Sequence, residues 1–239
     1  MSAPLSQIFS LTLIPVAATI FGGVVASYRV PGEKLRSFVQ HFAAGVVFAA
    51  VAGELLPEIT KGHQPVGVVI GFSLGVAVLL AVRQFAEALE RRSGEKGESS
   101  LIAAVGIDVF IDGLLIGVGF AAGARVGMLL VVALTLELLF LGVSVASSLG
   151  QSGVSRARTI LTISGLSLAV IVGSLLGGTL LQGLHGLALE IVLSFGAAAL
   201  LYLVTEELLT EAHEVKETPL ITAAFFAGFV ALYLIELST

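Results

Sequence analysis

The sequence has no cysteine among its 239 residues, which excludes disulfides, thiolate metal ligands and thiol redox centres. Charged residues are also scarce. Asp, Glu, Lys and Arg make up 12% of the chain, whereas about 25% is usual for a soluble domain. Hydrophobic residues make up 56%, and the 28 glycines suit close packing of helices in lipid. The composition therefore indicates an integral membrane protein.

Eight apolar stretches have roughly the 20 residues that an α-helix needs to cross a bilayer. They span residues 8–28, 37–59, 65–82, 101–124, 126–149, 159–182, 187–210 and 220–237. We therefore predict an all-α integral membrane protein with eight transmembrane helices in one transmembrane domain over residues 1–239. The polar run between Arg83 and Ser100 predicts a flexible loop.

The basic residues are distributed unevenly between the two sides of this arrangement. Ten of the twelve Lys and Arg residues fall on one side, and only Lys61 and Arg125 fall on the other. Because loops rich in Lys and Arg stay in the cytoplasm, both termini are predicted to be non-cytoplasmic. We expect a multi-pass protein of the cell membrane whose partners are the lipid bilayer and a transported ion.

Two aspartates interrupt the fourth apolar stretch. Asp108 and Asp112 are four residues apart, so on a helix they lie on one face, one turn from each other. Ionisable groups inside a membrane are costly and usually mark the route of an ion, a proton or a substrate. A purely structural role, with both groups capped by neighbouring polar atoms, is the alternative.

The fifth stretch carries a third acidic residue in a similar setting. Asp108 lies five residues before Gly113, and Glu137 lies five residues before Gly142. A short turn joins the two helices, so they are predicted to be antiparallel neighbours whose polar positions meet inside the membrane. Three carboxylates on facing helices form a plausible cation site. Because three negative charges repel one another, we expect one group to hold a proton when no cation is bound, and cation binding to weaken as the pH falls.

The second and seventh stretches are similar to each other. Residues 42–58 (FAAGVVFAAVAGELLPE) and 195–211 (FGAAALLYLVTEELLTE) share seven of seventeen positions, including two glutamates. By the charge distribution these helices run in opposite directions through the membrane. An inverted repeat of this kind is typical of secondary transporters. Chance similarity between two helices rich in Leu, Ala and Val is the alternative.

These motifs resemble the ZIP family of divalent metal cation transporters over the whole length of the chain. The second stretch, from His41 through Glu54 to Glu58, is the most specific match, and the seventh and sixth stretches agree with it. The resemblance implies eight helices with both termini outside. It also implies an inverted 3+2+3 arrangement, in which helices 1–3 and 6–8 surround a central pair. The expected substrate is a divalent cation of the zinc, manganese or iron class.

The family's metal-binding motifs on helices 4 and 5 are only half retained. Asp108 and Asp112 replace a histidine and a glutamate, and Glu137 replaces a histidine. Leu141 and Val170 stand where the family has metal-binding glutamates. The remaining metal ligands are Asp108, Asp112 and Glu137. A site with oxygen ligands alone suits manganese, magnesium or ferrous iron better than zinc.

Several polar residues near the ends of the second and seventh helices are candidates for an ion pathway, with solvated helix ends as the alternative reading. They are His41, Glu54, Glu58, Glu206, Glu207, Glu211 and His213. We expect the glutamates to guide a cation electrostatically at the two mouths.

Three classes of function remain open. The first is a ZIP-like transporter, and the second is a divergent relative with an impaired metal centre that moves another ion or has a sensing role. The third, an intramembrane enzyme, is disfavoured because both aspartates share one helix and no hydrolase motif is present. We therefore expect no enzymatic activity, no required cofactor, no nucleic-acid partner, and a metal ion as substrate. A homodimer is compatible with this class.

Overall fold

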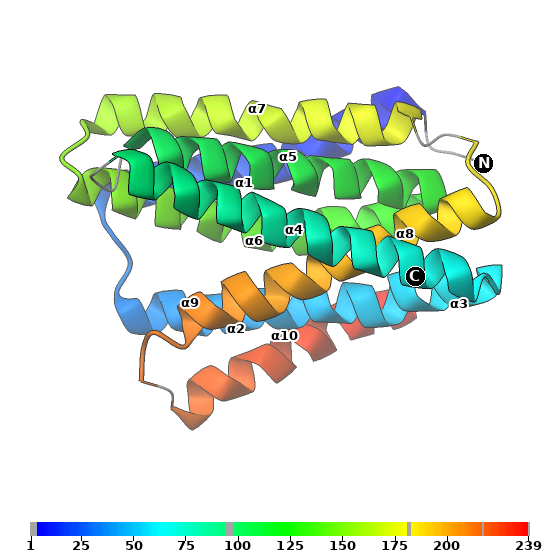
Figure 1. Ribbon diagram of the computed structural model, residues 1–239. Helices are drawn as coiled ribbons and strands as arrows, with labels where there is room; N and C mark the ends of the chain where they lie inside the picture. Colours follow the sequence, from blue (N-terminus) through cyan, green and yellow to red (C-terminus); the bar gives the residue numbers. More distant parts are fainter. Residues whose placement is uncertain (1–3, 94–97, 181–182, 217, 239) are drawn as a thin grey trace.

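The computed structural model describes residues 4–93, 98–180, 183–216 and 218–238, and this part of the chain contains helices and no strand. The helices lie side by side along one direction (Figure 1). Eight helical segments are long and apolar enough to cross a membrane. The prediction of an all-α chain with eight spans is therefore confirmed for the described residues.

Two of the eight spans are composite helices that contain a π-helical turn, written η. In chain order the elements are α1 (Leu5–Tyr28), α2 (Glu33–Ala50), η1 (Val51–Leu55), α3 (Leu56–Gly62), α4 (Pro65–Ser93), α5 (Glu98–Ala122), α6 (Ala124–Gln151), α7 (Arg156–Leu180), α8 (Leu187–Tyr202), η2 (Leu203–Leu208), α9 (Leu209–Ala212) and α10 (Pro219–Ser238).

The loop predicted between Arg83 and Ser100 is shorter than expected. Helix α4 continues through the polar residues as far as Ser93, and α5 already begins at Glu98. The segment after Arg83 is rich in Ala, Glu, Leu and Arg, which are strong helix formers. Charge ends an apolar run, but it does not end a helix. The hydrophobic pattern therefore located the span correctly and the helix end wrongly.

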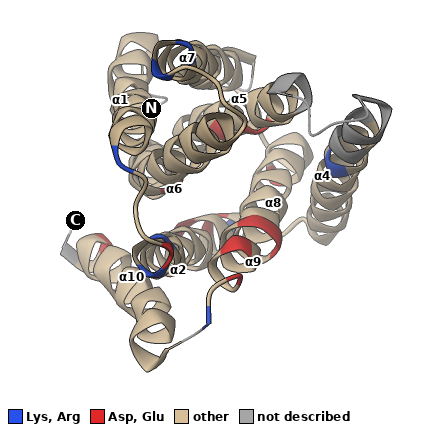
Figure 2. Cartoon of the chain, turned by 90° about the vertical axis from the view of Figure 1, so that its left-hand side faces the viewer, with Lys and Arg blue, Asp and Glu red and all other residues tan. Residues whose placement is uncertain are grey.

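The helices form two groups, which are visible when the bundle is viewed from one end (Figure 2). In the first group α1 packs on α6 and on α7, α5 packs on α7, and α5 contacts α6. In the second group α2 packs on α10 and α4 packs on α8. The groups meet where α2 contacts α6 and where α4 and α8 contact α5. Helices α5 and α6, which carry the three predicted carboxylates, therefore lie at this boundary.

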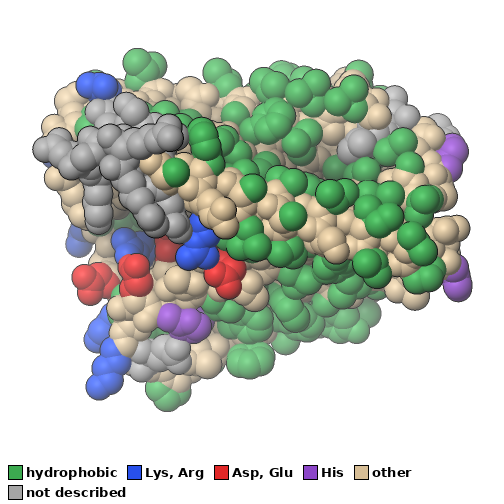
Figure 3. All heavy atoms as spheres, in the orientation of Figure 1, with side chains coloured by type: hydrophobic (Ala, Val, Ile, Leu, Met, Phe, Trp, Pro, Cys, Tyr) green, Lys and Arg blue, Asp and Glu red, His purple; other side chains and the backbone are tan. Residues whose placement is uncertain are grey.

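The two ends of the bundle differ in charge. The end with both chain termini, called the termini end, also carries Gly123 between α5 and α6 (Figure 1). The opposite end, called the basic end, carries the connections 29–32, 152–155 and 213–218. On the face drawn in Figure 3, the Lys and Arg side chains gather toward the basic end. This asymmetry is the feature from which the membrane orientation was predicted.

Glycine brings the central helices into backbone contact with their neighbours. A Cβ atom at Gly113 on α5 would collide with the backbone oxygen of Val170 on α7. A Cβ atom at Gly142 on α6 would collide with the backbone oxygen of Thr19 on α1. Only glycine permits so close an approach, as in other membrane helix pairs. These contacts hold α5 and α6 firmly beside their own partners.

Each π-helical turn lies within one copy of the predicted repeat. The amide of Leu56 donates to the backbone oxygen of Val51, and the amide of Leu209 donates to that of Val204. Both bonds span five residues rather than the four of an α-helix. When Phe42 is aligned with Phe195, Val51 falls on Val204 and Leu56 falls on Leu209. The same local distortion therefore occurs at matching places in the two helices.

Candidate metal centre

The structure brings Asp108, Asp112 and Glu137 together between α5 and α6. One carboxylate oxygen from each residue lies within 4.8 Å of the other two. Bonds from a divalent cation to oxygen are about 2.0–2.6 Å long, so ligands around one ion lie up to about 4–5 Å apart. The three carboxylates therefore have the spacing that a single divalent cation requires.

Two of these groups are almost completely buried. Asp112 is 2% exposed and Glu137 is 3% exposed, whereas Asp108 is half-buried. The carboxylates of Asp112 and Glu137 lie close enough to repel each other when both are ionised, and a bound cation or proton would lower that repulsion. Asp112 Oδ2 and Glu137 Oε2 have no hydrogen-bond partner. Unpartnered carboxylate oxygens in a buried site are costly, and a bound cation would satisfy them.

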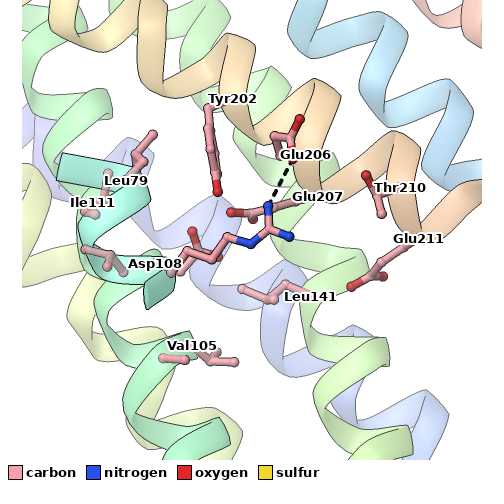
Figure 4. A pocket seen from close by; sticks show the side chains of 13 residues that line it. Leu79, Val105, Asp108, Ile111, Leu141, Tyr202, Glu206, Glu207, Thr210 and Glu211 are labelled. Atoms are coloured by element: carbon pink, nitrogen blue, oxygen red, sulfur yellow. Dashed lines mark hydrogen bonds and ion pairs between the residues drawn. The ribbon is translucent and has the colours of Figure 1, made fainter. Parts of the chain in front are cut away.

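A cavity of about 350 Å³ leads from the basic end to Asp108. Glu206, Glu207 and Glu211 line it from the η2 and α9 region, opposite Asp108 and Leu141. In Figure 4 the side chains of Asp108, Glu207 and Tyr202 point toward one another. Arg83 from α4 forms an ion pair of 3.0 Å with Glu206 in the same cavity. The cavity wall is therefore largely apolar, and its charged side chains are four acidic residues and one arginine.

A second cavity, of about 30 Å³, reaches the cluster from another direction. It is lined by Glu137, Glu207 and Glu211, with Gln40 and Ser144 beside them. Gln40 Nε2 donates a hydrogen bond to Glu211, and Ser144 Oγ donates one of 3.4 Å to the same carboxylate. Because Glu207 and Glu211 line both cavities, they connect the cluster with the basic end.

The three carboxylates differ in their position relative to these two cavities. Asp108 lines the larger cavity, Glu137 lines the smaller one, and Asp112 lines neither. Asp112 lies one helical turn farther from the basic end than Asp108 and is almost completely buried. The cavities thus reach Asp108 and Glu137, whereas Asp112 is enclosed.

The other predicted pathway residues divide between the two ends. Glu206, Glu207 and Glu211 line the larger cavity, as described above. Glu54 and Glu58 lie toward the termini end, where they pair with Arg125 at 3.0 Å and with Lys61 at 2.7 Å.

His41 and His213 line neither of the two cavities at the cluster. The His41 ring is buried and stacks edge-on against His213 with 5.1 Å between ring centroids. Its Nδ1 lies 2.9 Å from the backbone oxygen of Ser37. The ring contact joins α2 to the end of α9, whereas the contact with Ser37 lies within α2.

Sequence reasoning missed three residues that shape the cavities, namely Arg83, Tyr202 and Gln40. Gln40 is 1% exposed and its Oε1 has no partner, and the Tyr202 hydroxyl is buried without one. A polar residue next to His41 in an apolar stretch was a usable signal for Gln40. Nothing in the spacing of Arg83 or Tyr202 indicated that α4 and η2 would bring them beside the acidic residues.

Comparison with known proteins does not add to this picture. No protein-family model and no curated protein sequence matches the chain. The functional argument therefore depends on the geometry of the carboxylate cluster and its cavities.

Proposed function

We propose that this protein is a ZIP-like transporter that moves a divalent metal cation across the membrane through the site formed by Asp108, Asp112 and Glu137. The observation that carries the proposal is a cluster of three carboxylates, with unpartnered oxygens, enclosed in an eight-helix bundle. A packing role would leave these oxygens unsatisfied at a cost that no nearby group offsets. The acidic cavity at the basic end supplies a route to the cluster.

The inverted 3+2+3 arrangement belongs to this proposal, and the packing supports it. Helix α1 packs on α6 as α7 packs on α5, and α2 packs on α10 as α8 packs on α4. A Cβ atom at Gly228 on α10 would meet the backbone oxygen of Phe42, and one at Gly75 on α4 would lie 2.9 Å from that of Phe195. Phe42 and Phe195 are the aligned first residues of the repeat. Exchanging the two halves thus maps each contact named here onto another of them.

The cargo we propose is a cation that accepts oxygen ligands. The cluster contains carboxylates and no histidine, a donor set that suits manganese or ferrous iron better than zinc. All three ions belong to the class expected from the family resemblance. The donor set therefore ranks them by expected affinity and excludes none of them. The metal is the transported substrate, and the mechanism requires no resident cofactor.

The orientation we propose places the basic end in the cytoplasm. Connections rich in Lys and Arg are retained on that side, so both termini would face outward. The cavity that reaches Asp108 would then lie in the cytoplasmic half of the protein, as we expect for an inward-facing state. Alternating access would require a second state with the cluster open toward the termini end.

A divergent ZIP-fold protein that moves another ion, or that senses one, is the second candidate. Leu141 lines the cavity at a position where the resemblance implies a glutamate. Val170 stands at another such position, where it is fully buried and its backbone packs against Gly113. Neither residue can ligate a metal, so a binuclear centre of the family type is unsupported. This candidate predicts cation binding without uptake.

The deciding experiment compares metal uptake into proteoliposomes by the parent and by three variants. Asp112→Asn and Glu137→Gln keep the side-chain shape and remove the charge, so uptake and binding of manganese should fall at least tenfold. Glu58→Gln is the matched control, because Glu58 pairs with Lys61 near the termini end and should leave uptake within about twofold. If both cluster variants transport and bind manganese like the parent, the carboxylates are structural and the proposal is wrong.

A further inference from the structure

A single arginine connects the two groups of helices at the termini end. Arg125, at the start of α6, places Nε 3.0 Å from Glu54 Oε1 in η1. Its guanidinium also donates a hydrogen bond of 2.8 Å to the backbone oxygen of Glu236 in α10. Helix α6 belongs to the first helix group, whereas η1 and α10 belong to the second. Arg125 thus links the central helices to their surroundings.

The acidic partners of this link are arranged around η1. The Glu236 carboxylate lies directly over Gly53, the residue before Glu54, where any Cβ atom would collide with it. The Glu54 side chain is only 11% exposed, while that of Arg125 is 52% exposed. A partly buried carboxylate loses much of its hydration, so its pairing with a fixed guanidinium is stronger than that of a fully exposed pair.

Between Arg125 and the cluster, α6 buries several apolar side chains. The side chains of Val126, Leu129, Leu130, Ala133 and Leu134 are all buried. Arg125 precedes Glu137 by twelve residues, which is about 18 Å along a helix. At the basic end, in contrast, the larger cavity reaches Asp108. The larger cavity thus reaches the cluster at Asp108, whereas the α6 residues between Arg125 and Glu137 named above are buried.

We propose that Arg125 is the latch of a gate at the termini end, and that its bonds to Glu54 and Glu236 keep this gate closed while the cluster is open at the basic end. The proposal rests on the transport function proposed above. In this proposal, opening the termini end moves α6 away from η1 and α10 and breaks both contacts of the guanidinium. The acidic side chains that remain would then face an approaching cation.

Two reporter cysteines on α6 can detect the gate without measuring transport. Ala133 and Leu141 lie one turn on either side of Glu137, on the same helix face. Ala133 is fully buried, whereas Leu141 lines the cavity at the basic end. The chain has no native cysteine, so Ala133→Cys and Leu141→Cys each give one labelling site. In lipid nanodiscs a water-soluble thiol reagent reaches both ends.

In the latched protein we expect slow labelling at Ala133→Cys and fast labelling at Leu141→Cys. Adding Arg125→Ala or Glu54→Gln should raise the rate at position 133 at least fivefold and lower the rate at position 141. The charge-swapped pair Arg125→Glu with Glu54→Arg restores the ion pair but not the bond to the Glu236 backbone oxygen, so both rates should return part of the way to those of the parent. Lys61→Ala is the matched control, because its ion pair with Glu58 lies within one helix and links no groups.

The proposed gating role of Arg125 is wrong if Arg125→Ala leaves the labelling rate at position 133 unchanged in a protein that keeps the parent's thermal stability. If the variant is destabilised, the charge-swapped pair decides, since a restored fold with no recovery of the rates contradicts a gating role. These readouts need no cargo. Loss of the proposed transport function would appear in the uptake assay alone, so the two failures can be told apart.

Discussion

Asp112 and Glu137 face each other across α5 and α6, and each has one oxygen without a partner. Two carboxylates this close repel each other unless a proton or a cation lies between them, and coordination of a cation requires both groups to be deprotonated. Proton and metal thus compete for the same oxygens. At the scale of single residues, this competition is the property by which a cation site differs from a packing contact.

We therefore expect metal binding to weaken as the pH falls. A carboxylate must lose its proton before it can ligate, so acid adds a cost to binding and the Kd for manganese should rise at lower pH. Isothermal titration calorimetry on the purified protein between pH 5 and 8 measures this directly. Asp112→Asn removes one competing group and should flatten the dependence. A parent Kd that does not change with pH would contradict the proposed competition between protons and the metal for these carboxylates.

The acidic cluster could be predicted from residue spacing alone. The four-residue separation of Asp108 and Asp112 places both on one helix face, and Glu137 matches Asp108 relative to the glycine that follows it. The enclosure of Asp112 and the pairing of Arg83 with Glu206 could not be predicted in this way. Both depend on how deeply helices far apart in the sequence interlock, which spacing along one helix does not specify.

At the scale of helices, the close approach of α5 to α7 determines where Asp112 lies. Gly113 is the next residue, and its backbone packs against the carbonyl group of Val170. A side chain at this position would separate the two helices and displace the aspartate. The same holds for Gly142 between α6 and α1, so two glycines position the helices that carry the three carboxylates.

Gly113→Ala should lower the thermal stability of the protein in detergent and weaken metal binding together. The added methyl group collides with a backbone atom that cannot rotate away, and overpacking of this kind costs about 1–3 kcal/mol. Gly165→Ala in α7 is the matched control, because no atom lies within 4 Å of its added Cβ. That change should be neutral or stabilising by up to about 1 kcal/mol through helix propensity. Equal melting temperatures for the two variants would refute the packing argument.

Helix number and position followed from hydrophobic length, whereas helix ends and internal distortions did not. The eight apolar stretches correspond to the eight long helices, because the bilayer requirement leaves little freedom in length. The extension of α4 to Ser93 results from helix propensity in polar residues, which hydropathy does not register. The π-helical turns result from packing and carry no distinct mark in composition.

At the scale of the whole molecule, the two helix groups are the units that we expect to move relative to each other. The difference in charge between the two ends relates this movement to the two sides of the membrane. The carboxylates lie on the boundary between the groups, so a relative displacement of the groups would change access to them. The concentration of Lys and Arg at the basic end relates these states to the sides of the membrane.

A cysteine at Ser93, at the end of α4, should be labelled from the cytoplasm only. Ser93 lies beyond Arg83 on the basic end, which the positive-inside bias retains in the cell. The measurement uses an impermeant maleimide on intact cells and on inverted vesicles, and Lys61→Cys serves as the control for the outer side. Labelling of Ser93→Cys in intact cells would reverse the proposed orientation.

The π-helical turns η1 and η2 restrict the positions at which residues can be deleted from these helices or inserted into them. A π-helical turn holds one residue more than an α-helical turn, so deletion of one residue there returns the helix to regular geometry and leaves both flanks in place. A deletion anywhere else in α2 or α8 would rotate everything beyond it by about 100° and turn Glu54 or Glu207 away from its neighbours. Variation in length within these two helices should therefore be confined to Val51–Leu55 and Leu203–Leu208.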